Sequence, residues 1–246
     1  MNKTSNENIM NKLLTHSLFI LMLLLISCGD SDKDGDSDAD GRRSPLVKDR
    51  KYGIKSAIIE YDVSGSQEGS RRLYFDNWGE RQAEYSNTTI TVGQFSKTAN
   101  LINITDGDWQ YTINMDSKSG TKSQSQLKEL KTELEDQQYF NELGEQVIIK
   151  MGGYKTGTEE YFGKECDVYE FRNIGMKAWY WKWILLKSET RSGPVNIIVT
   201  ARKIEEDVRV PEDRFRVPED ISLNTVDLGD IEGQMRREQE ERDKDK

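Results

Sequence analysis

The chain contains very little histidine. Its one histidine, His16, lies in the N-terminal stretch that is interpreted below as a signal sequence. A mature chain without histidine cannot carry out Ser-His-Asp or Cys-His catalysis, and it has no imidazole with which to hold zinc or haem. Carboxylate-pair and lysine chemistry remain open, but the sequence predicts a protein that is not an enzyme and that needs no cofactor.

Cysteine is equally scarce, with only Cys28 and Cys166 in 246 residues. If Cys28 is consumed by processing, Cys166 has no partner within the chain, which excludes a disulfide framework. The position of Cys166 beside Val168 on an alternating strand favours a small buried hydrophobe. The alternative is a redox-active or lipidated thiol, for which Lys164 is the basic neighbour in sequence.

Positive charge is in deficit, since 35 lysines and arginines face 44 acidic residues, for a formal net charge of −9. An acidic surface argues against nucleic acid as a partner, because phosphate backbones select basic patches.

Apolar runs are short, and the longest is the nine-residue stretch at 18–26 that follows Lys3 and Lys12. Nine residues suit the apolar core of a signal peptide, whereas a spanning helix needs about twenty. The run ends in L-I-S-C at 25–28, which resembles the lipobox of bacterial lipoproteins. That resemblance implies cleavage after residue 27 and acylation of Cys28, with palmitate among the chains. An ordinary cleaved signal or a short buried helix is the alternative.

Residues 28–51 follow as a strongly acidic stretch, with two tandem D-x-D-x-D-G copies. Mutual repulsion and the lack of an apolar face predict a flexible tether. Alternate aspartates before glycine also begin a calcium loop, but the twelfth position, where a glutamate is wanted, holds Gly41 or Val47. The run also resembles surface-export signals of Bacteroidetes lipoproteins. The weak calcium candidates are Asp30, Asp32, Asp34, Asp36, Asp38 and Asp40.

Residues 52–221 read as short strands separated by Gly, Asn and Asp turns, which predicts an antiparallel meander. Turns at 76–79 and 106–108 have the composition of hairpin turns. The predicted strands are 52–63, 71–75, 81–85, 101–104, 109–115, 161–171, 179–186 and 195–203. In the first of them Ala57, Ile59, Tyr61 and Val63 share one face.

One helix interrupts this pattern. Leu127, Leu130 and Leu134 recur at three- and four-residue spacing, and Gly144 is a possible C-cap. The narrow apolar stripe predicts packing on the concave side of the sheet. After residue 221 the apolar pattern fades, so residues 222–246 are expected to form a charged, disordered or solvated helical tail.

Several motifs together resemble the LolA-like and LppX-like bacterial outer-membrane lipoproteins. They are G-T-E-E at 157–160, G-K-E-C-D-V-Y-E-F at 163–171, L-K-S-E at 186–189 and V-P-E-D-R-F-R-V-P at 210–218. The resemblance covers about residues 52–220 and implies a mainly β, α+β fold: a curved antiparallel half-barrel whose concave side is covered by one or two helices. Members of the family hold acyl chains between sheet and helices, so a lipid or lipoprotein ligand is implied.

The candidate ligand-binding residues are the alternating Trp179, Trp181 and Trp183 with Leu130 and Leu134 of the helix. The tryptophans either line a pocket or fill the core, and Trp183, next to an expected turn, is expected to be exposed. The sequence thus predicts a lipid-anchored lipoprotein of the outer membrane, facing the periplasm or the surface, that binds a hydrophobic ligand. The alternative is a structural or interaction module with a filled core and an envelope protein as partner.

Overall fold

The computed structural model describes residues 51–124, 148–149 and 151–226. Four predicted features therefore lie outside the described residues: the signal sequence with Cys28, the acidic tether, the helix that carries Leu130 and Leu134, and the tail from residue 227 onward.

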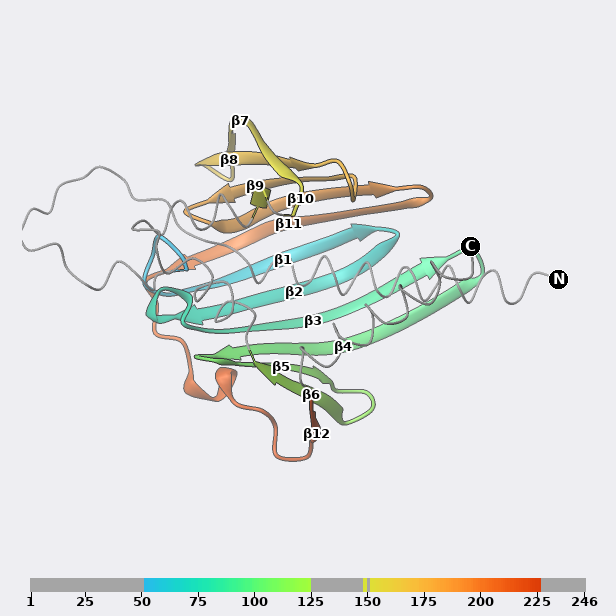
Figure 1. Cartoon of the computed structure of the whole chain (residues 1–246), viewed down its shortest axis with the longest axis vertical. Helices are drawn as coiled ribbons and strands as arrows, with labels where there is room; N and C mark the ends of the chain where they lie inside the picture. Colours follow the sequence, from blue (N-terminus) through green and yellow to red (C-terminus); the bar gives the residue numbers. More distant parts are fainter. Residues whose placement is uncertain (1–50, 125–147, 150, 227–246) are drawn as a thin grey trace, which may run out of the picture.

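The described residues form one curved sheet of twelve strands (Figure 1). The strands are β1 (Ala57–Gly65), β2 (Gln67–Asp76), β3 (Arg81–Val92), β4 (Phe95–Asp106), β5 (Trp109–Asn114), β6 (Ser119–Gln124), β7 (Gly153–Tyr161), β8 (Lys164–Phe171), β9 (Met176–Trp181), β10 (Ile184–Ser192), β11 (Val195–Glu206) and β12 (Ser222–Thr225). Two 3-10 turns accompany them, η2 (Asn77–Gly79) and η3 (Glu212–Phe215).

The sheet consists of two antiparallel meanders that lie side by side. One runs from β1 to β6 and the other from β7 to β11, and the pairing of β1 with β11 joins them. β12 pairs in parallel with β6 at one edge, so four residues of the predicted tail belong to the sheet. The predicted antiparallel meander is confirmed, and the long-range pairing of β1 with β11 makes it one sheet.

Two predicted hairpin turns are confirmed. Asn77, Trp78 and Gly79 all have positive φ, which turns β2 into β3. Glycine is required at position 79 for two reasons. Its φ is +89°, and a Cβ there would lie 2.6 Å from the ring of Tyr52. The second turn, at 107–108, joins β4 to β5 with Gly107 at φ +56°.

Two stretches that were predicted as single strands each form two strands in the structure. The stretch 161–171 turns back at Phe162 and Gly163, and the stretch 179–186 turns back at Lys182 and Trp183. All four turn residues have positive φ. Apart from Gly163 they are not residue types that favour such turns, so composition alone did not reveal them, although the family resemblance implied a turn after Lys182.

The curvature comes with irregularities in the pairing. Register shifts occur at Glu60/Tyr61, between Leu185 and Lys187, and between Lys155 and Gly157. An extra residue in one strand bends it and increases its twist. The predicted mainly β, curved antiparallel sheet is thus confirmed, whereas the helices expected over its concave side are not among the described residues.

The unshifted register from β1 to β4 defines two faces of that half of the sheet. The first face carries Ile59, Leu73, Glu84 and Asn103, which are successive cross-strand partners. The second face carries the adjacent residue of each strand. These residues are Ile58, Tyr74, Ala83 and Ile104, which are also successive cross-strand partners. The first face joins the main core cluster through β1 and β2, and the second packs against Val210 and Phe215 of the chain after β11.

Candidate functional site

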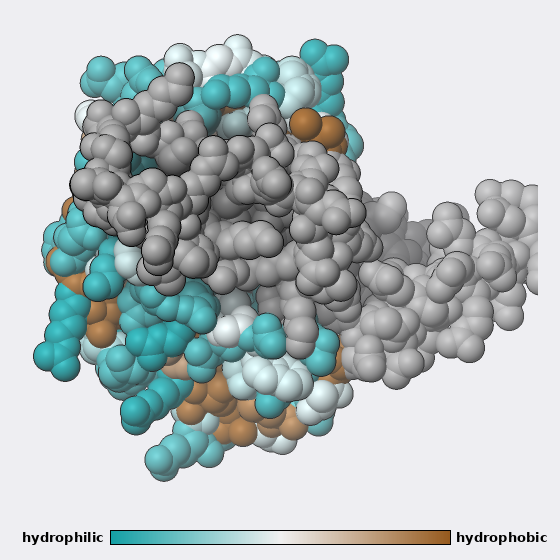
Figure 2. All heavy atoms as spheres, turned by 60° about the vertical axis from the view of Figure 1, so that its left-hand side comes forward, coloured by the Kyte–Doolittle hydropathy of each residue, from teal (hydrophilic) through white to brown (hydrophobic). Residues whose placement is uncertain are grey.

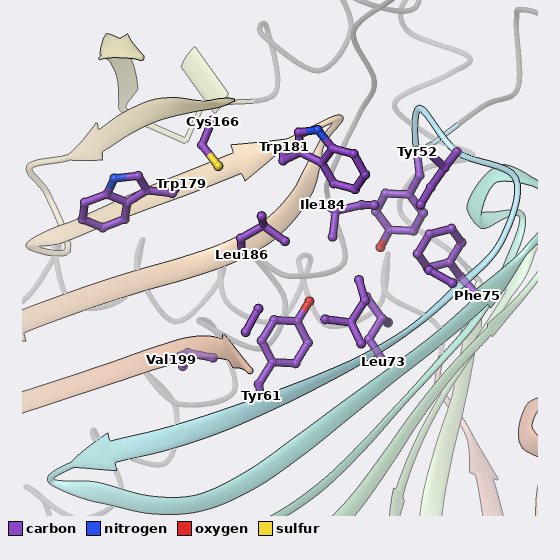
Figure 3. Close-up of a cluster of buried hydrophobic side chains, with 14 of the residues drawn as sticks. Tyr52, Tyr61, Leu73, Phe75, Cys166, Trp179, Trp181, Ile184, Leu186 and Val199 are labelled. Carbon is purple, nitrogen blue, oxygen red and sulfur yellow. The ribbon is translucent and has the colours of Figure 1, made fainter. Parts of the chain in front are cut away.

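Two of the three candidate tryptophans are part of the main core. Trp179 is 4% exposed and Trp181 is 9% exposed, and both belong to the cluster that contains Tyr52, Phe75 and Ile184. Figure 3 shows Trp181 beside Ile184 and Tyr52, in the space between β9–β10 and β1–β2. These positions fit a filled core in this part of the sheet.

Charged side chains complete the surroundings of Trp179. Its indole N–H donates to Glu159 over 2.8 Å, and the Nζ atoms of Lys177 and Lys187 lie 4.7 and 4.2 Å from the ring centroid. Hydrogen bonds from Lys177 and then Trp179 lower the pKa of Glu159. The two ammonium groups thus lie over the indole ring as cation–π contacts.

Trp183 differs from the prediction. It is 6% exposed rather than exposed, and it belongs to a second cluster, in which its ring stacks on Tyr169 at 6.0 Å with an interplanar angle of 29°. Because β9 ends at Trp181 and the chain turns, Trp183 does not continue the alternation of Trp179 and Trp181. Its indole nitrogen is buried without a hydrogen-bond partner.

The prediction for Cys166 is confirmed, because the side chain is fully buried and the thiol is free. Burial raises the pKa of Cys166 to about 11. A thiol that is inaccessible and protonated near neutral pH is a poor nucleophile. The sulfur therefore serves packing, next to Val168 in the main core.

The first face becomes polar where it reaches β3 and β4, and it stays buried there. Gln82, Glu84 and Asn103 are each at most 3% exposed. The amide oxygen of Gln82 accepts hydrogen bonds from Lys51 at 2.7 Å and from Tyr52 at 2.8 Å, but its Nε2 has no partner. Such a buried donor carries a desolvation cost of roughly 1–3 kcal/mol.

Glu84 lies at the centre of this polar region. Its carboxylate is 4.0 Å from the guanidinium of Arg71, too far for a hydrogen bond, and one oxygen is buried and unpaired. Burial raises the pKa of Glu84, with Arg71 and then Lys51 opposing the shift. The pair is thus a buried electrostatic contact that depends on pH.

An open groove of about 550 Å³ lies on the second face of the sheet. Apolar and aromatic side chains, among them Tyr74, Tyr85, Ile102 and Met115, contribute to its lining, and Asn87 and Asn100 extend it along β3 and β4. The register explains this set, because Tyr85 and Ile102 are cross-strand partners, as are Asn87 and Asn100. Figure 2 shows a surface that is hydrophilic over most of the coloured area, with hydrophobic patches in a few places.

Arginines form the rim of the groove. Arg72 comes from β2 and Arg202 from β11, and both bind the carboxylate of Glu60. Arg214 comes from η3, which two contacts hold against the sheet. Glu212 forms an ion pair with Arg81 at 2.9 Å. The buried ring of Phe215 has its centroid 4.9 Å from the guanidinium carbon of the same arginine.

The groove is equipped for binding. Among the described residues that line it there is no His, Cys, Asp, Glu or Lys, so within that set serine and tyrosine hydroxyls are the only groups of the usual acid–base or nucleophilic types. Among residues 51–124, 148–149 and 151–226, no group of three or more potential metal ligands occurs. In the same described ranges, no helix is both long and apolar enough to span a membrane. The predicted calcium candidates lie outside these ranges.

Sequence reasoning did not find this groove. The alternation of Arg72 with Tyr74 and of Tyr85 with Asn87 is visible in the sequence, but it also fits an ordinary solvated strand face. Arg202 and Arg214 reach the same site only through the β1–β11 pairing and the return of the chain in η3. The sequence signal that exists is the mixture of tyrosine and arginine at alternating positions of these strands.

No family model matches the chain, and no curated protein matches it either. Remote likenesses to solved structures exist. An uncharacterized conserved protein from Thermus thermophilus has a TM-score of 0.46 at 9% identity, over 74% of this chain and 95% of that one. LprF from Mycobacterium bovis has a TM-score of 0.30 at 10% identity, over 65% and 90%. An outer membrane lipoprotein-sorting protein domain from Vibrio parahaemolyticus has a TM-score of 0.27 at 10% identity, over 66% and 89%.

Proposed function

We propose that the protein is a cell-envelope lipoprotein, held to a membrane by acyl chains on Cys28, that binds a hydrophobic ligand such as a lipid or an acyl chain without catalysis. The observation that carries the binding function is the groove of about 550 Å³ with Tyr85, Ile102 and Met115 in its lining. Concave sites of several hundred Å³ with an apolar lining and a few polar groups are the usual form of small-ligand sites. The signal sequence and its L-I-S-C ending support the anchor.

A second candidate function is that of an interaction module of the envelope with a filled interior. The burial of Trp179, Trp181 and Trp183 in two core clusters favours it for the part of the sheet around β8–β10. In that case those tryptophans serve stability alone. The two candidates differ in whether the groove retains a ligand.

Binding is tested first with the acylated protein extracted in mild detergent, by native mass spectrometry. We expect a retained mass of lipid size in addition to the covalent anchor. A second measurement is thermal unfolding of the chain expressed from Gly29, with and without a long-chain fatty alcohol. Ligand at a hundredfold excess over its dissociation constant should stabilise the folded state by about 2.7 kcal/mol.

Two substitutions localise the effect. Met115→Glu places a charge in the groove and should abolish the shift, whereas Ile149→Glu, at a residue 59% exposed and outside the groove, should leave it unchanged. Leu130 and Leu134 remain predicted contacts, and Leu134→Ala should weaken binding if the helix takes part. Absence of both a retained lipid and a ligand-dependent shift would favour the interaction module.

A further inference from the structure

The rim of the groove has the opposite charge balance to the whole chain. Acidic residues outnumber basic ones by 44 to 35 in the sequence, yet the groove-lining residues within the described part of the chain include arginines and no aspartate or glutamate. Arg71 belongs to the first face, because it pairs with Tyr61 and Ser86, so the cations of the rim are Arg72, Arg202 and Arg214.

Arg72 and Arg202 are arranged to share one carboxylate. The Nη2 atom of each lies 2.7 Å from a different oxygen of Glu60. Their side chains are 46% and 49% exposed, and one carboxylate balances only one of the two charges. Asp62 lies 3.6 Å from Arg202 but is itself 58% exposed, so solvent screens it. Each guanidinium has five N–H donors, more than Glu60 can occupy.

Arg214 provides the third cation. Its guanidinium carbon lies 5.4 Å from the centroid of Tyr74 and 5.8 Å from that of Tyr85. The hydroxyl of Tyr85 donates to the main-chain oxygen of Arg214 over 3.0 Å, which fixes the backbone there. The Nε of Arg214 is buried without a hydrogen-bond partner, and the carboxylate of Asp213 is 3.9 Å away and 70% exposed.

We propose that the groove is selective for an anionic amphiphile, in which a carboxylate or phosphate group is bound by Arg72, Arg202 and Arg214 while the apolar body lies along Ile102 and Met115. This inference rests on the proposed hydrophobic-ligand function and adds its headgroup. Guanidinium groups match the planar oxygen pairs of carboxylate and phosphate, and their charge-assisted hydrogen bonds are stronger than those to a neutral hydroxyl.

The test compares probes of one chain length on the acylated protein, held in nanodiscs of zwitterionic phosphatidylcholine. Octyl phosphate, octanoate and octanol are titrated by calorimetry below their micellar concentrations, and inorganic phosphate is titrated as the headgroup alone. We expect the two anions to bind at least about tenfold more tightly than octanol, as loss of a charge-assisted hydrogen bond predicts. Inorganic phosphate should bind much more weakly than octyl phosphate.

Matched arginine variants assign the effect to the rim. Arg72→Gln and Arg214→Gln should each weaken octyl phosphate binding by about tenfold and leave octanol binding unchanged. Arg172→Gln is the control, because Arg172 also stacks on a tyrosine, at 4.6 Å from Tyr154, but lies outside the groove. Thermal unfolding of each variant confirms that it is folded.

Each of the other possible titration results would overturn a specific part of the proposal. Equal affinity for octanol and octyl phosphate in the wild type would overturn the anion selectivity and leave the hydrophobic-ligand function standing. Inorganic phosphate binding as tightly as octyl phosphate would overturn the amphiphile, because the apolar body would then contribute nothing. Failure of all four probes would overturn the proposed function itself. The wild-type series needs no variant, so a misfolded variant does not block the conclusion.

Discussion

Truncation of Trp183 distinguishes a core side chain from a ligand-contacting one. Trp183→Ala removes a ring that is 6% exposed and lies 6.0 Å from Tyr169 and 6.2 Å from Tyr180. A buried aromatic side chain covers roughly 150–250 Å², which at about 25 cal/mol per Å² corresponds to about 4–6 kcal/mol. The variant also removes a buried N–H without a partner, which returns roughly 1–3 kcal/mol. The expected net loss is therefore about 1–5 kcal/mol, with a central value of about 3 kcal/mol.

Two further variants sharpen this prediction. Trp183→Phe keeps a ring in place and removes the unpaired donor, so we expect a loss below about 1.5 kcal/mol. Trp109→Ala is the control, because Trp109 is 36% exposed in β5, and the expected loss is below about 1 kcal/mol. The positive φ of Trp183 is the same strain for Ala and Phe, so it cancels in the comparison.

The assay is urea unfolding of the chain expressed from Gly29, without ligand, followed by circular dichroism. Linear extrapolation gives the free energy of unfolding of each variant. If Trp183→Ala lost less than about 1 kcal/mol and instead weakened lipid binding, Trp183 would line a pocket and the assignment to the core would be wrong.

Three other predictions concern the anchor, the acidic repeat and the buried carboxylate. Cys28→Ala should give a protein that incorporates no clickable fatty acid during metabolic labelling, and persistent label would contradict the lipoprotein assignment. Calcium titration of the chain from Gly29 should show no saturable binding below the millimolar range, and a micromolar site lost on Asp30→Ala with Asp36→Ala would contradict the tether. Because burial raises the pKa of Glu84 in the folded state, its contribution is fully present below the unfolded pKa of about 4.3 and is lost as pH rises through the folded value. Glu84→Gln should therefore flatten the fall in unfolding free energy with rising pH, and an identical slope in urea titrations of both proteins would refute this.

Local patterns account for the parts of the fold that were predicted correctly. Ala57, Ile59, Tyr61 and Val63 recur at every second position, and all four are buried on one side of β1. The turn at 76–79 was predictable because Asn and Gly accept positive φ at little cost. The turn at Phe162 was not predictable from residue preferences, because Phe does not normally favour positive φ, and the turn beside Trp183 was expected only from the family resemblance.

The candidate site likewise has features that the sequence predicted and features that it did not. The sequence identified the apolar, aromatic character of the 179–183 stretch, but the turn inside it sends Trp183 to a different cluster from Trp181. The arginine groove could not be predicted, because Arg72, Arg202 and Arg214 are brought together by pairings that span more than 100 residues. Long-range pairing depends on which distant segments pack against each other. A local sequence pattern contains no information on that choice.

The sequence by itself determined the class of the protein: mainly β, acidic, almost without histidine, and preceded by a signal-like run that ends at Cys28. These properties depend on composition and on periodicity over a few residues, which set strand propensity and surface charge locally. Only the tertiary structure decided that β1 pairs with β11, that the tryptophans are buried, and that three arginines line one groove together with apolar and aromatic side chains. The physical reason is that burial and charge convergence are properties of surfaces built from distant segments, and they exist only once the strands of the sheet have found their long-range partners.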